Sequence, residues 1–335
     1  MPTHKSQMRK IKLSQEENFT SEDEFVEFIK PLLQKNSGDI GIGDDAAVVD
    51  FGGQKLVATT DMLVENVHFQ DTWVTPKYLG RKAALTNLSD MSAMGAMPEF
   101  ALVSLIMRPN QWQKGFVDKL YQGLLMEFGP YKVRICGGNI TQGAVFSITL
   151  MILGRVHKQP LLRSGAKMGD LLCVTGSLGR MASEVKQLLE NKIQQAKELP
   201  VCRLKFAQTI NQEKLPSSGL DISDGLALDL QRLCQASQVG AVVWQQNLPI
   251  DHNLHVAGYS KQETLRLVLS GGEDYELLFT LHPNKLELIK KLARTENTPF
   301  SVIGEITPQN AGLKLKTTSG KLLPLNPKGW DHIRA

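Results

Sequence analysis

The sequence GIGDDAA at residues 41–47 places two adjacent acids, Asp44 and Asp45, directly after a glycine-rich turn. Glycine and alanine carry little or no side chain, so a ligand can approach the backbone closely at this point. Residues 55–60 then read as a buried strand, and the sequence TTD at 59–61 places two hydroxyl groups and a third acid at its end. In both segments, the acids lie next to a turn or strand that would hold them in fixed positions.

Four later segments repeat this combination of a polar ligand group with small residues. They read NLSDMSAMG at 87–95, GGN at 137–139, DISDG at 221–225 and GGED at 271–274. For any one of them alone, a turn or a helix cap is the more common explanation. All six segments together would form a cluster of like charge, which a cation must offset.

The chemistry of these side chains favours a hard metal ion. They offer carboxylate, carbonyl and hydroxyl oxygens without thiolates or paired histidines, which suits Mg²⁺. Mg²⁺ held by acids usually also holds the phosphates of a nucleotide. The sequence has no GxxxxGK[ST] and no HRD…DFG set, which excludes a P-loop protein and a protein kinase. The phosphates must therefore be held by metals, glycine-loop amides and a few side chains.

Composition narrows the class of protein further. The chain has 335 residues, of which 42% are hydrophobic, enough for a packed core in one large or two ordinary domains. Lysine plus arginine number 38 and aspartate plus glutamate 34, which argues against a nucleic-acid partner held by bulk charge. No apolar run approaches the roughly 20 residues that span a membrane. Four widely spaced cysteines without a CxxC fit a reducing cytoplasm, so we expect a cytoplasmic protein.

Helical and strand-like segments alternate along the chain. We expect residues 1–20 to form a mobile arm, because they are polar and mostly charged. The stretch 157–169 contains glycine and proline and reads as a domain boundary, which gives domains at 21–157 and 158–335. Strands are expected at 101–107, 145–156, 171–175, 275–281 and 300–306, and helices from Ser21, from Thr75 and over 111–128, 181–199 and 224–237. This mixture predicts an α/β or α+β protein.

The acid-bearing segments also occur in a characteristic order. The sequences GIGDDAAVV, TTDMLVENVHF, NLSDMSAMGA, GGN, RSGAKMGD, LDISDG, SGGEDYELLF and KGWDHI follow one another between residues 41 and 333. In this order they resemble the thiamine-monophosphate kinase family, over nearly the whole chain apart from the N-terminal arm. GIGDD alone would indicate only the wider aminoimidazole-ribotide-synthetase-like ATP-binding superfamily. The VHF, GGEDYEL and KGWDH segments favour this kinase within it.

The resemblance implies a two-domain fold of the aminoimidazole-ribotide-synthetase-like type. Its N-terminal α/β domain binds ATP and Mg²⁺ and pairs with its twin in a homodimer, and a C-terminal α/β domain follows. The implied activity is ATP-dependent phosphorylation of thiamine monophosphate to thiamine diphosphate, by direct in-line transfer assisted by several Mg²⁺ ions. The nucleophile is then a phosphate oxygen, largely ionised at neutral pH, so no strong general base is required.

The resemblance also assigns roles to single residues. Metal ligands would be Asp45, Thr59, Thr60, Asp61, Asp90, Asn139, Asp221 and Asp224, with Asp44 beside Asp45. Nucleotide contacts would be Tyr121, Gly138, Asn139, Arg163 and Ser223, and substrate contacts would be His68, Glu273 and Trp330. Asn139 departs from the family, because many members have aspartate at this place. Its amide oxygen can still ligate Mg²⁺ but contributes no negative charge.

Other interpretations stay open from the residues alone. His68 could be a packed or capping residue, Glu273 a solvated turn acid and Trp330 a packing residue. A selenophosphate synthetase would carry a reactive cysteine near its N-terminus, but the first cysteine here is Cys136. An aminoimidazole-ribotide synthetase would not need the GGEDYEL and KGWDH pair. A nucleotide-binding regulator without the chemistry would have lost several acids, and a metal buffer would not explain Arg163.

Overall fold

The computed structural model describes residues 18–32 and 39–333. They belong to two compact units, the first with residues 18–32 and 331–333 and the second with residues 39–330. The expected mobile arm lies, apart from residues 18–20, outside the described residues. In the first unit, helix α1 (Glu22–Ile29) begins where predicted, because the Ser21 hydroxyl accepts the N–H of Glu24 at 3.2 Å.

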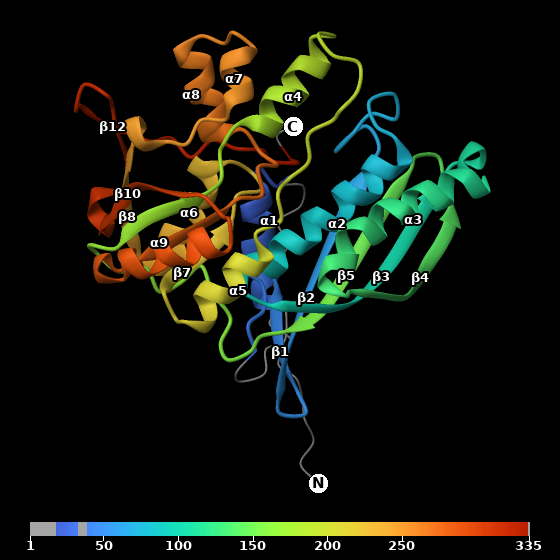
Figure 1. The fold of residues 1–335 in the computed structure, drawn as a ribbon, viewed down its shortest axis with the longest axis horizontal. Helices are drawn as coiled ribbons and strands as arrows, with labels where there is room; N and C mark the ends of the chain where they lie inside the picture. Colours follow the sequence, from blue (N-terminus) through green and yellow to red (C-terminus); the bar gives the residue numbers. More distant parts are fainter. Residues whose placement is uncertain (1–17, 33–38, 334–335) are drawn as a thin grey trace. The chain divides into compact units, whose positions relative to one another are not determined.

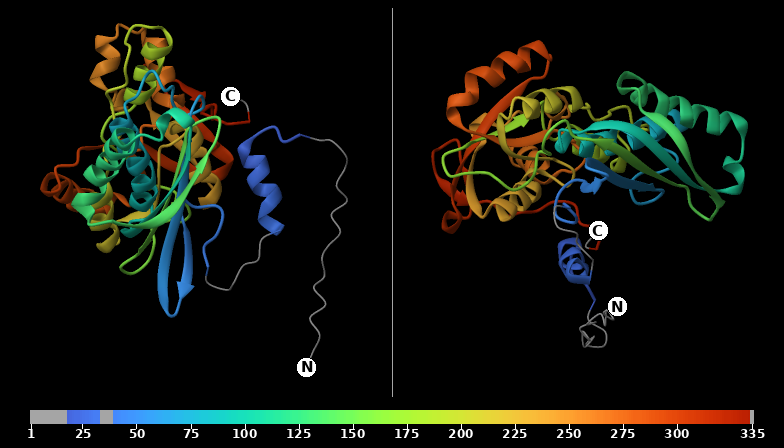
Figure 2. Two further views of the ribbon diagram at one scale, coloured as in Figure 1. Left: turned by 90° about the vertical axis from the view of Figure 1, so that its right-hand side faces the viewer. Right: turned by 90° about the horizontal axis from the view of Figure 1, so that it is seen from below.

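The second unit opens with a five-stranded sheet in the order β1-β2-β5-β3-β4. Its strands are β1 (Ala47–Phe51), β2 (Gln54–Val64), β3 (Met97–Met107), β4 (Arg134–Gln142) and β5 (Ser147–Arg155). Neighbouring strands are antiparallel except β3 and β4, which run parallel. Helices α2 (Pro76–Ala93) and α3 (Lys114–Phe128) lie together over one face of this sheet (Figures 1 and 2). Strand β4 is the last in the strand order and is therefore an edge strand.

A seven-stranded sheet follows in the order β12-β11-β8-β10-β6-β9-β7. Its strands are β6 (Leu171–Thr175), β7 (Pro216–Asp221), β8 (Val239–Trp244), β9 (Leu277–Leu281), β10 (Phe300–Pro308), β11 (Leu313–Lys316) and β12 (Leu322–Pro324). The helices of this half are α4 (Arg180–Leu189), α5 (Leu204–Gln212), α6 (Leu226–Ser237), α7 (His252–Val256), α8 (Lys261–Ser270) and α9 (Leu286–Thr295). One core packs α6 and α8 against the sheet and another packs α5 and α9. The predicted two-domain α/β architecture is confirmed.

Helix α2 is the central helix of this unit, and 13 of its 18 residues are buried. It contacts α3 and the first sheet, and also α5 and β7 of the second half. As predicted, Thr75 caps it by accepting the N–H of Tyr78 at 3.2 Å, and Pro76 is its first residue. Gly80 permits the close approach of α3, because a Cβ there would lie 2.1 Å from the carbonyl oxygen of Leu120. Polar residues on α2 are thus carried into the space between the two halves.

One predicted helix is much shorter than expected. Helix α4 ends at Leu189, so the prediction of a helix over 181–199 is wrong in its second half. The carboxylate of Glu184 accepts the backbone N–H groups of Lys197 at 2.6 Å and Glu198 at 2.9 Å. These bonds draw the chain back along the helix, and tertiary contacts outweigh the helical propensity of this polar stretch.

One smaller prediction is also decided. The strand expected at 171–175 is confirmed with the same bounds as β6. Among the residues that the structure describes, no helix is long and apolar enough to cross a membrane. All four cysteines are free thiols.

Candidate active site

The polar residues of α2 point toward the second half of the unit. Lys82 lies about two helical turns from Ser89 and Asp90, so the three residues share one side of the helix. The hydroxyl of Ser89 donates to Oδ2 of Asp221 at 2.5 Å, and Nζ of Lys82 lies 2.7 Å from Oε1 of Glu273. Both partners belong to the second half. Helix α2 therefore links the first half of the molecule to acids of the second half.

At one end of this polar side, Asp90 meets strand β2. Its Oδ2 accepts a hydrogen bond from Oγ1 of Thr59 at 2.5 Å. Asp61 lies on the same face of β2 as Thr59, because side chains alternate along a strand. Burial raises the pKa of Asp90 well above its ordinary value. The neighbouring carboxylates that raise it further are those of Asp61, Asp221 and Asp45.

Two of these neighbours show the same effect. Burial raises the pKa of Asp61 to about 6, and the charge of Asp224 adds to that shift. Burial also raises the pKa of Asp221 well above its usual range, with the charge of Asp45 as the next contribution. Acids from both halves therefore lie close enough to repel one another. Such a cluster either binds a cation or holds protons.

One cation already reaches this cluster. The guanidinium of Arg163 pairs with the carboxylate of Asp45, and its Nε lies 3.1 Å from Oδ1. The backbone N–H of Arg163 donates to Asp44 at 2.8 Å. Burial raises the pKa of Asp45, and the charge of Arg163 opposes that shift. The other carboxylate oxygen of Asp45, Oδ2, is buried and accepts no hydrogen bond from the described residues.

This donor set fits Mg²⁺ that arrives with a nucleotide. Within residues 18–32 and 39–333, no three histidine, cysteine, aspartate or glutamate side chains already surround one metal position. Mg²⁺ usually takes one or two carboxylates and completes its shell with water and substrate phosphates. The buried Oδ2 of Asp45, which lacks a donor, is the kind of oxygen that such an ion satisfies.

The loop after β7 is held by two residues that the sequence analysis missed. Asp229, in the first turn of α6, accepts the N–H groups of Asp224 at 3.0 Å and Gly225 at 3.1 Å. Arg232 lies 2.5 Å from the carboxylate of Asp224 and 2.9 Å from that of Asp229. Asp224 thus stands beside the cluster with a cationic partner of its own. An acid in the first helical turn with an arginine three residues later was the available signal.

The predicted substrate contacts His68 and Glu273 lie on two sides of Lys82, which the sequence motifs did not single out. Nζ of Lys82 is 3.2 Å from the carbonyl oxygen of His68, in addition to its 2.7 Å contact with Glu273. The Lys82 side chain is only 5% exposed. Nδ1 of the His68 ring accepts the N–H of Val64 at 3.0 Å. A single lysine in GRKAAL has no spacing that would indicate this role.

Ser223, Glu273 and Trp330 come together at one loop. The carbonyl of Ser223 accepts the N–H of Glu273 at 2.7 Å, and the carbonyl of Asp224 accepts the N–H of Trp330 at 2.9 Å. Gly329 permits this approach, because a Cβ there would lie 2.4 Å from the Asp224 carbonyl oxygen. The Trp330 side chain is 43% exposed, so part of its ring surface is accessible.

Four predicted residues differ in their surroundings from the buried acids. Gly138 and Asn139 are exposed on the edge strand β4. Thr60 is exposed on the face of β2 that points away from α2, and its hydroxyl donates to a carbonyl of β5 at 2.9 Å. Tyr121 on α3 packs against the core of the first half. The hydrogen bonds of the described acid cluster involve none of the side chains of Thr60, Tyr121 and Asn139.

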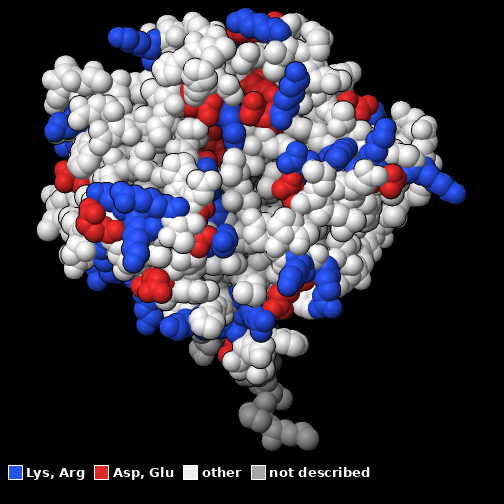
Figure 3. Space-filling view, viewed as in Figure 1, with Lys and Arg blue, Asp and Glu red and all other residues white. Residues whose placement is uncertain are grey.

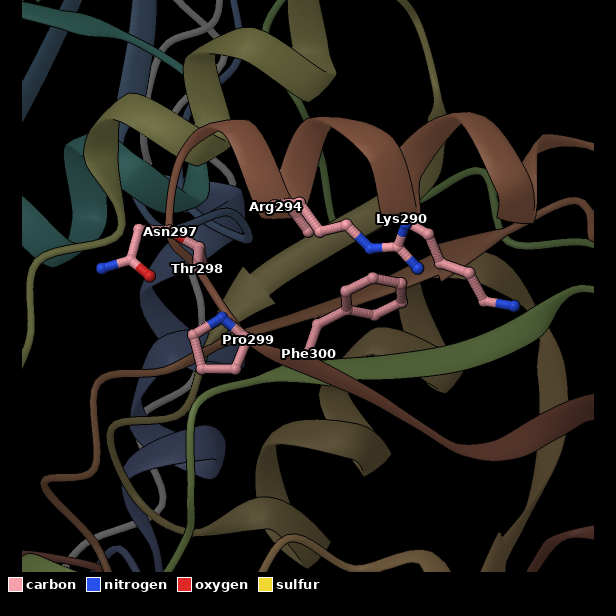
Figure 4. A pocket seen from close by; sticks show the side chains of 7 residues that line it. Lys290, Arg294, Asn297, Thr298, Pro299 and Phe300 are labelled. Carbon is pink, nitrogen blue, oxygen red and sulfur yellow. The ribbon is translucent and has the colours of Figure 1, made fainter.

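Neither the surface charge nor the cavity found elsewhere in the molecule belongs to this site. On the face drawn in Figure 3, basic and acidic side chains alternate, and no extended basic patch is visible. A cavity of about 390 Å³ lies between α9 and β10, with Lys290, Arg294 and Phe300 among its lining residues (Figure 4). None of the predicted site residues lines it.

The chain resembles known proteins over most of its length. Residues 43–156 match the AIR synthase related protein N-terminal domain, and residues 167–316 match the corresponding C-terminal domain. The thiamine-monophosphate kinase of Buchnera aphidicola subsp. Acyrthosiphon pisum is 33% identical, over 94% of this chain and 99% of that protein. That of Escherichia coli K12 is 35% identical, over 88% and 92%. The solved structure of AaThiL complexed with AMPPCP and TMP has a TM-score of 0.79 at 30% identity, over 93% and 97%.

Proposed function

The chain belongs to the AIR synthase-related family and to its thiamine-monophosphate kinases, and we propose that it transfers phosphate at the acids around α2. It phosphorylates thiamine monophosphate with ATP and gives thiamine diphosphate and ADP. The proposed location rests on the cluster of buried acids from both halves, in which Oδ2 of Asp45 has no hydrogen-bond donor among the described residues.

The reaction joins two anions. An oxygen of the substrate phosphate forms a bond to the γ-phosphorus of ATP, the bond from that phosphorus to the β-phosphate oxygen breaks, and ADP leaves with the electron pair. In-line transfer of this kind needs positioning and charge neutralisation more than acid–base chemistry. The residues of this chain must therefore hold cations and orient two phosphate-bearing molecules.

Mg²⁺, when bound, would supply the positive charge that lets the two phosphates approach. We assign its ligands to the carboxylates that the fold gathers, namely Asp45, Asp61, Asp90, Asp221 and Asp224. Thr59 orients Asp90 by its 2.5 Å hydrogen bond, and Ser89 orients Asp221 in the same way. Arg163 pairs with Asp45 in this structure, and its guanidinium is close enough to the cluster to contact phosphate oxygens in the complex.

Helix α2 sets the direction of the substrates. Asp90 and Lys82 are eight residues apart, which corresponds to about 12 Å along the helix axis. We place the reacting phosphates at the Asp90 end and the thiamine rings at the Lys82 end, beside His68 and Glu273. The partly exposed ring of Trp330, tied to the Asp224 carbonyl, supplies a flat surface for a cationic ring.

We assign the remaining nucleotide contacts to Ser223, Tyr121, Gly138 and Asn139. Ser223 is next to the metal loop, which supports its assignment directly. Gly138 lies where a Cβ would stand 1.7 Å from the Val103 carbonyl oxygen, so a residue with a side chain would clash with β3 there. Asn139 could complete a metal shell through its amide oxygen without adding charge.

A coupled assay tests the proposal. Purified protein should form thiamine diphosphate from ATP and thiamine monophosphate in Mg²⁺, and chelation of the metal should stop the reaction. ADP should appear only when thiamine monophosphate is present. Steady ADP release without that substrate, or product formation that survives chelation, would contradict the proposed chemistry.

We also propose that the chain forms a homodimer through the open face of the first sheet. Strand alternation puts the exposed apolar residues Met62, Leu102, Ile106 and Met151 on the face opposite α2 and α3. An exposed apolar sheet face of this kind usually marks an interface. Sedimentation should show a dimer for the wild-type protein and a monomer for Leu102→Asp, and a monomeric wild type would contradict the proposal.

The remaining assignments concern organisation and location. We propose domains at 21–157 and 158–335, because the two sheets use residues 47–155 and 171–324. We propose a cytoplasmic location, where ATP is available and four free cysteines stay reduced. Limited proteolysis that cut first within 157–169 would support the boundary.

A further inference from the structure

We propose that Lys82 is the positioning residue of the thiamine end of the site. It holds the carboxylate of Glu273 and the turn at His68 in the orientation that receives the thiamine rings. The inference rests on the proposed function and adds to it a residue that no sequence motif indicates.

Lys82 has the geometry of a tether between the two halves. An ammonium group has three N–H donors and no acceptor. Two of its partners are Oε1 of Glu273 at 2.7 Å and the carbonyl oxygen of His68 at 3.2 Å. Because the Lys82 side chain is 5% exposed, water replaces these partners poorly. The two contacts therefore fix the Glu273 carboxylate relative to the His68 turn.

The backbone of Glu273 is held just as tightly from the other side. Its φ is 67°, and that of Tyr275 is 51°, so two residues with side chains adopt the left-handed region within one turn. The N–H of Glu273 donates to the Ser223 carbonyl at 2.7 Å, and the N–H of Tyr275 donates to the Ile222 carbonyl at 2.8 Å. Strained backbone of this kind persists only where its surroundings over-determine it.

The contact with Lys82 leaves one side of Glu273 available. Lys82 approaches Oε1 of Glu273 at 2.7 Å. The Glu273 side chain is 24% exposed, whereas that of Lys82 is 5% exposed, so the open side belongs to the carboxylate. A fixed carboxylate that stays partly exposed suits the amino group of an aminopyrimidine or the edge of a cationic ring. Lys82 thus acts through Glu273 rather than on the reacting phosphates.

The test compares the Lys82→Met variant with the same substitution at a lysine that makes similar contacts elsewhere in the chain. Nζ of Lys285 contacts the carbonyl oxygens of Lys214 at 2.7 Å and Leu215 at 3.2 Å, away from the site, so Lys285→Met is the matched control. We expect Lys82→Met to raise KM for thiamine monophosphate at least about tenfold, which corresponds to about 1.4 kcal/mol. KM for ATP should change less than about twofold, and Lys285→Met should leave both constants unchanged.

Three more variants separate positioning from a purely structural role. Glu273→Gln should raise KM for thiamine monophosphate as Lys82→Met does, and the double variant should be no worse than the more severe single one, because the two residues act as a pair. Lys82→Arg keeps the charge and should recover most of the affinity. If Lys82→Met does not fold, Glu273→Gln and Lys82→Arg still carry the comparison.

The outcomes separate this inference from the function on which it rests. A wild-type protein that forms no thiamine diphosphate overturns the proposed function. An active wild type with equal effects of Lys82→Met on both substrates overturns the role of Lys82 alone. Additive losses in the double variant overturn it as well.

Discussion

The molecule contains two groups of acids that differ in how many of their carboxylates have a partner inside the chain. In the group from the segment at 273–276, each acid has a partner inside the chain. Glu276 lies 2.6 Å from two nitrogens of Arg203, Glu273 pairs with Lys82 at 2.7 Å, and Asp274 accepts the N–H of Gly179 at 2.8 Å at the start of α4. In the group around α2, Asp45 pairs with Arg163 and Asp224 with Arg232, whereas Asp61, Asp90 and Asp221 form no ion pair among the described residues.

This difference separates residues that position the site from residues that await a ligand. The cations and backbone donors of the 273–276 segment hold its turn in place, although Oδ1 of Asp274 is buried without a hydrogen-bond partner. The carboxylates of Asp61, Asp90 and Asp221 have pKa values raised by burial and by the charges of neighbouring acids. A cation from outside would relieve both effects at once. A raised pKa alone does not mark a metal-binding position, because burial also raises the pKa of Asp274 to about 8; the mark is that several such acids lie together around α2.

The largest expected effect comes from removing an acid of the α2 group. Asp90→Ala and Asp221→Ala should each lower kcat by about 100- to 1000-fold, because a group that stabilises transition-state charge is lost. Circular dichroism should show that both variants are folded, and Asp118→Ala on the exposed side of α3 is the control. Near-normal kinase rates for both variants would remove these acids from the metal site.

Breaking a pair in the other group should act on stability instead. Arg203→Met leaves the Glu276 carboxylate buried without its cation, which should lower the free energy of unfolding by about 3 kcal/mol. Urea denaturation measures this loss. KM for ATP and for thiamine monophosphate should stay within about twofold of the wild-type values. A variant of wild-type stability with altered KM values would reverse the roles of the two groups.

The pH dependence of stability gives a third way to separate the groups. Asp61 has a pKa raised from 3.8 to about 6 in the folded protein, so the folded state binds the proton more tightly than the unfolded chain. This contribution is fully present below about pH 4 and is lost as pH rises through about 6. The metal-free Asp61→Asn variant should therefore gain melting temperature relative to wild type as pH rises across that window. A difference that does not change with pH would contradict the raised pKa.

The smallest effect should come from the partly exposed aromatic surface. Trp330→Ala should raise KM for thiamine monophosphate about 2- to 30-fold, the range of a cation–π contact of about 0.5–2 kcal/mol. KM for ATP should change much less, because the proposal assigns the Trp330 ring to the thiamine rings and not to the nucleotide. Trp112→Ala, also exposed at 50%, is the control. Equal effects on both substrates would place Trp330 outside the thiamine pocket.

Local sequence patterns predicted most of the helices and strands. Strand β6 has the predicted bounds, and Thr75-Pro76 begins α2 as a capping hydroxyl and a proline predict. Strand alternation would also have separated Thr60 from Thr59 and Asp61, since the structure places Thr60 on the opposite face. The end of α4 could not be predicted, because it depends on the contact of Glu184 with backbone groups beyond the helix.

The amino-acid sequence alone was enough for the family, the hard-metal chemistry and most of the candidate residues, since glycine turns and acids at strand and helix ends are local features. Only the tertiary structure decided which acids keep a partner. Ser89 and Asp221 are 132 residues apart in the chain, and Lys82 meets Glu273 across the two halves. Contacts over such separations follow from how the sheets pack around α2, and burial there, rather than residue type, determines which carboxylates need a cation.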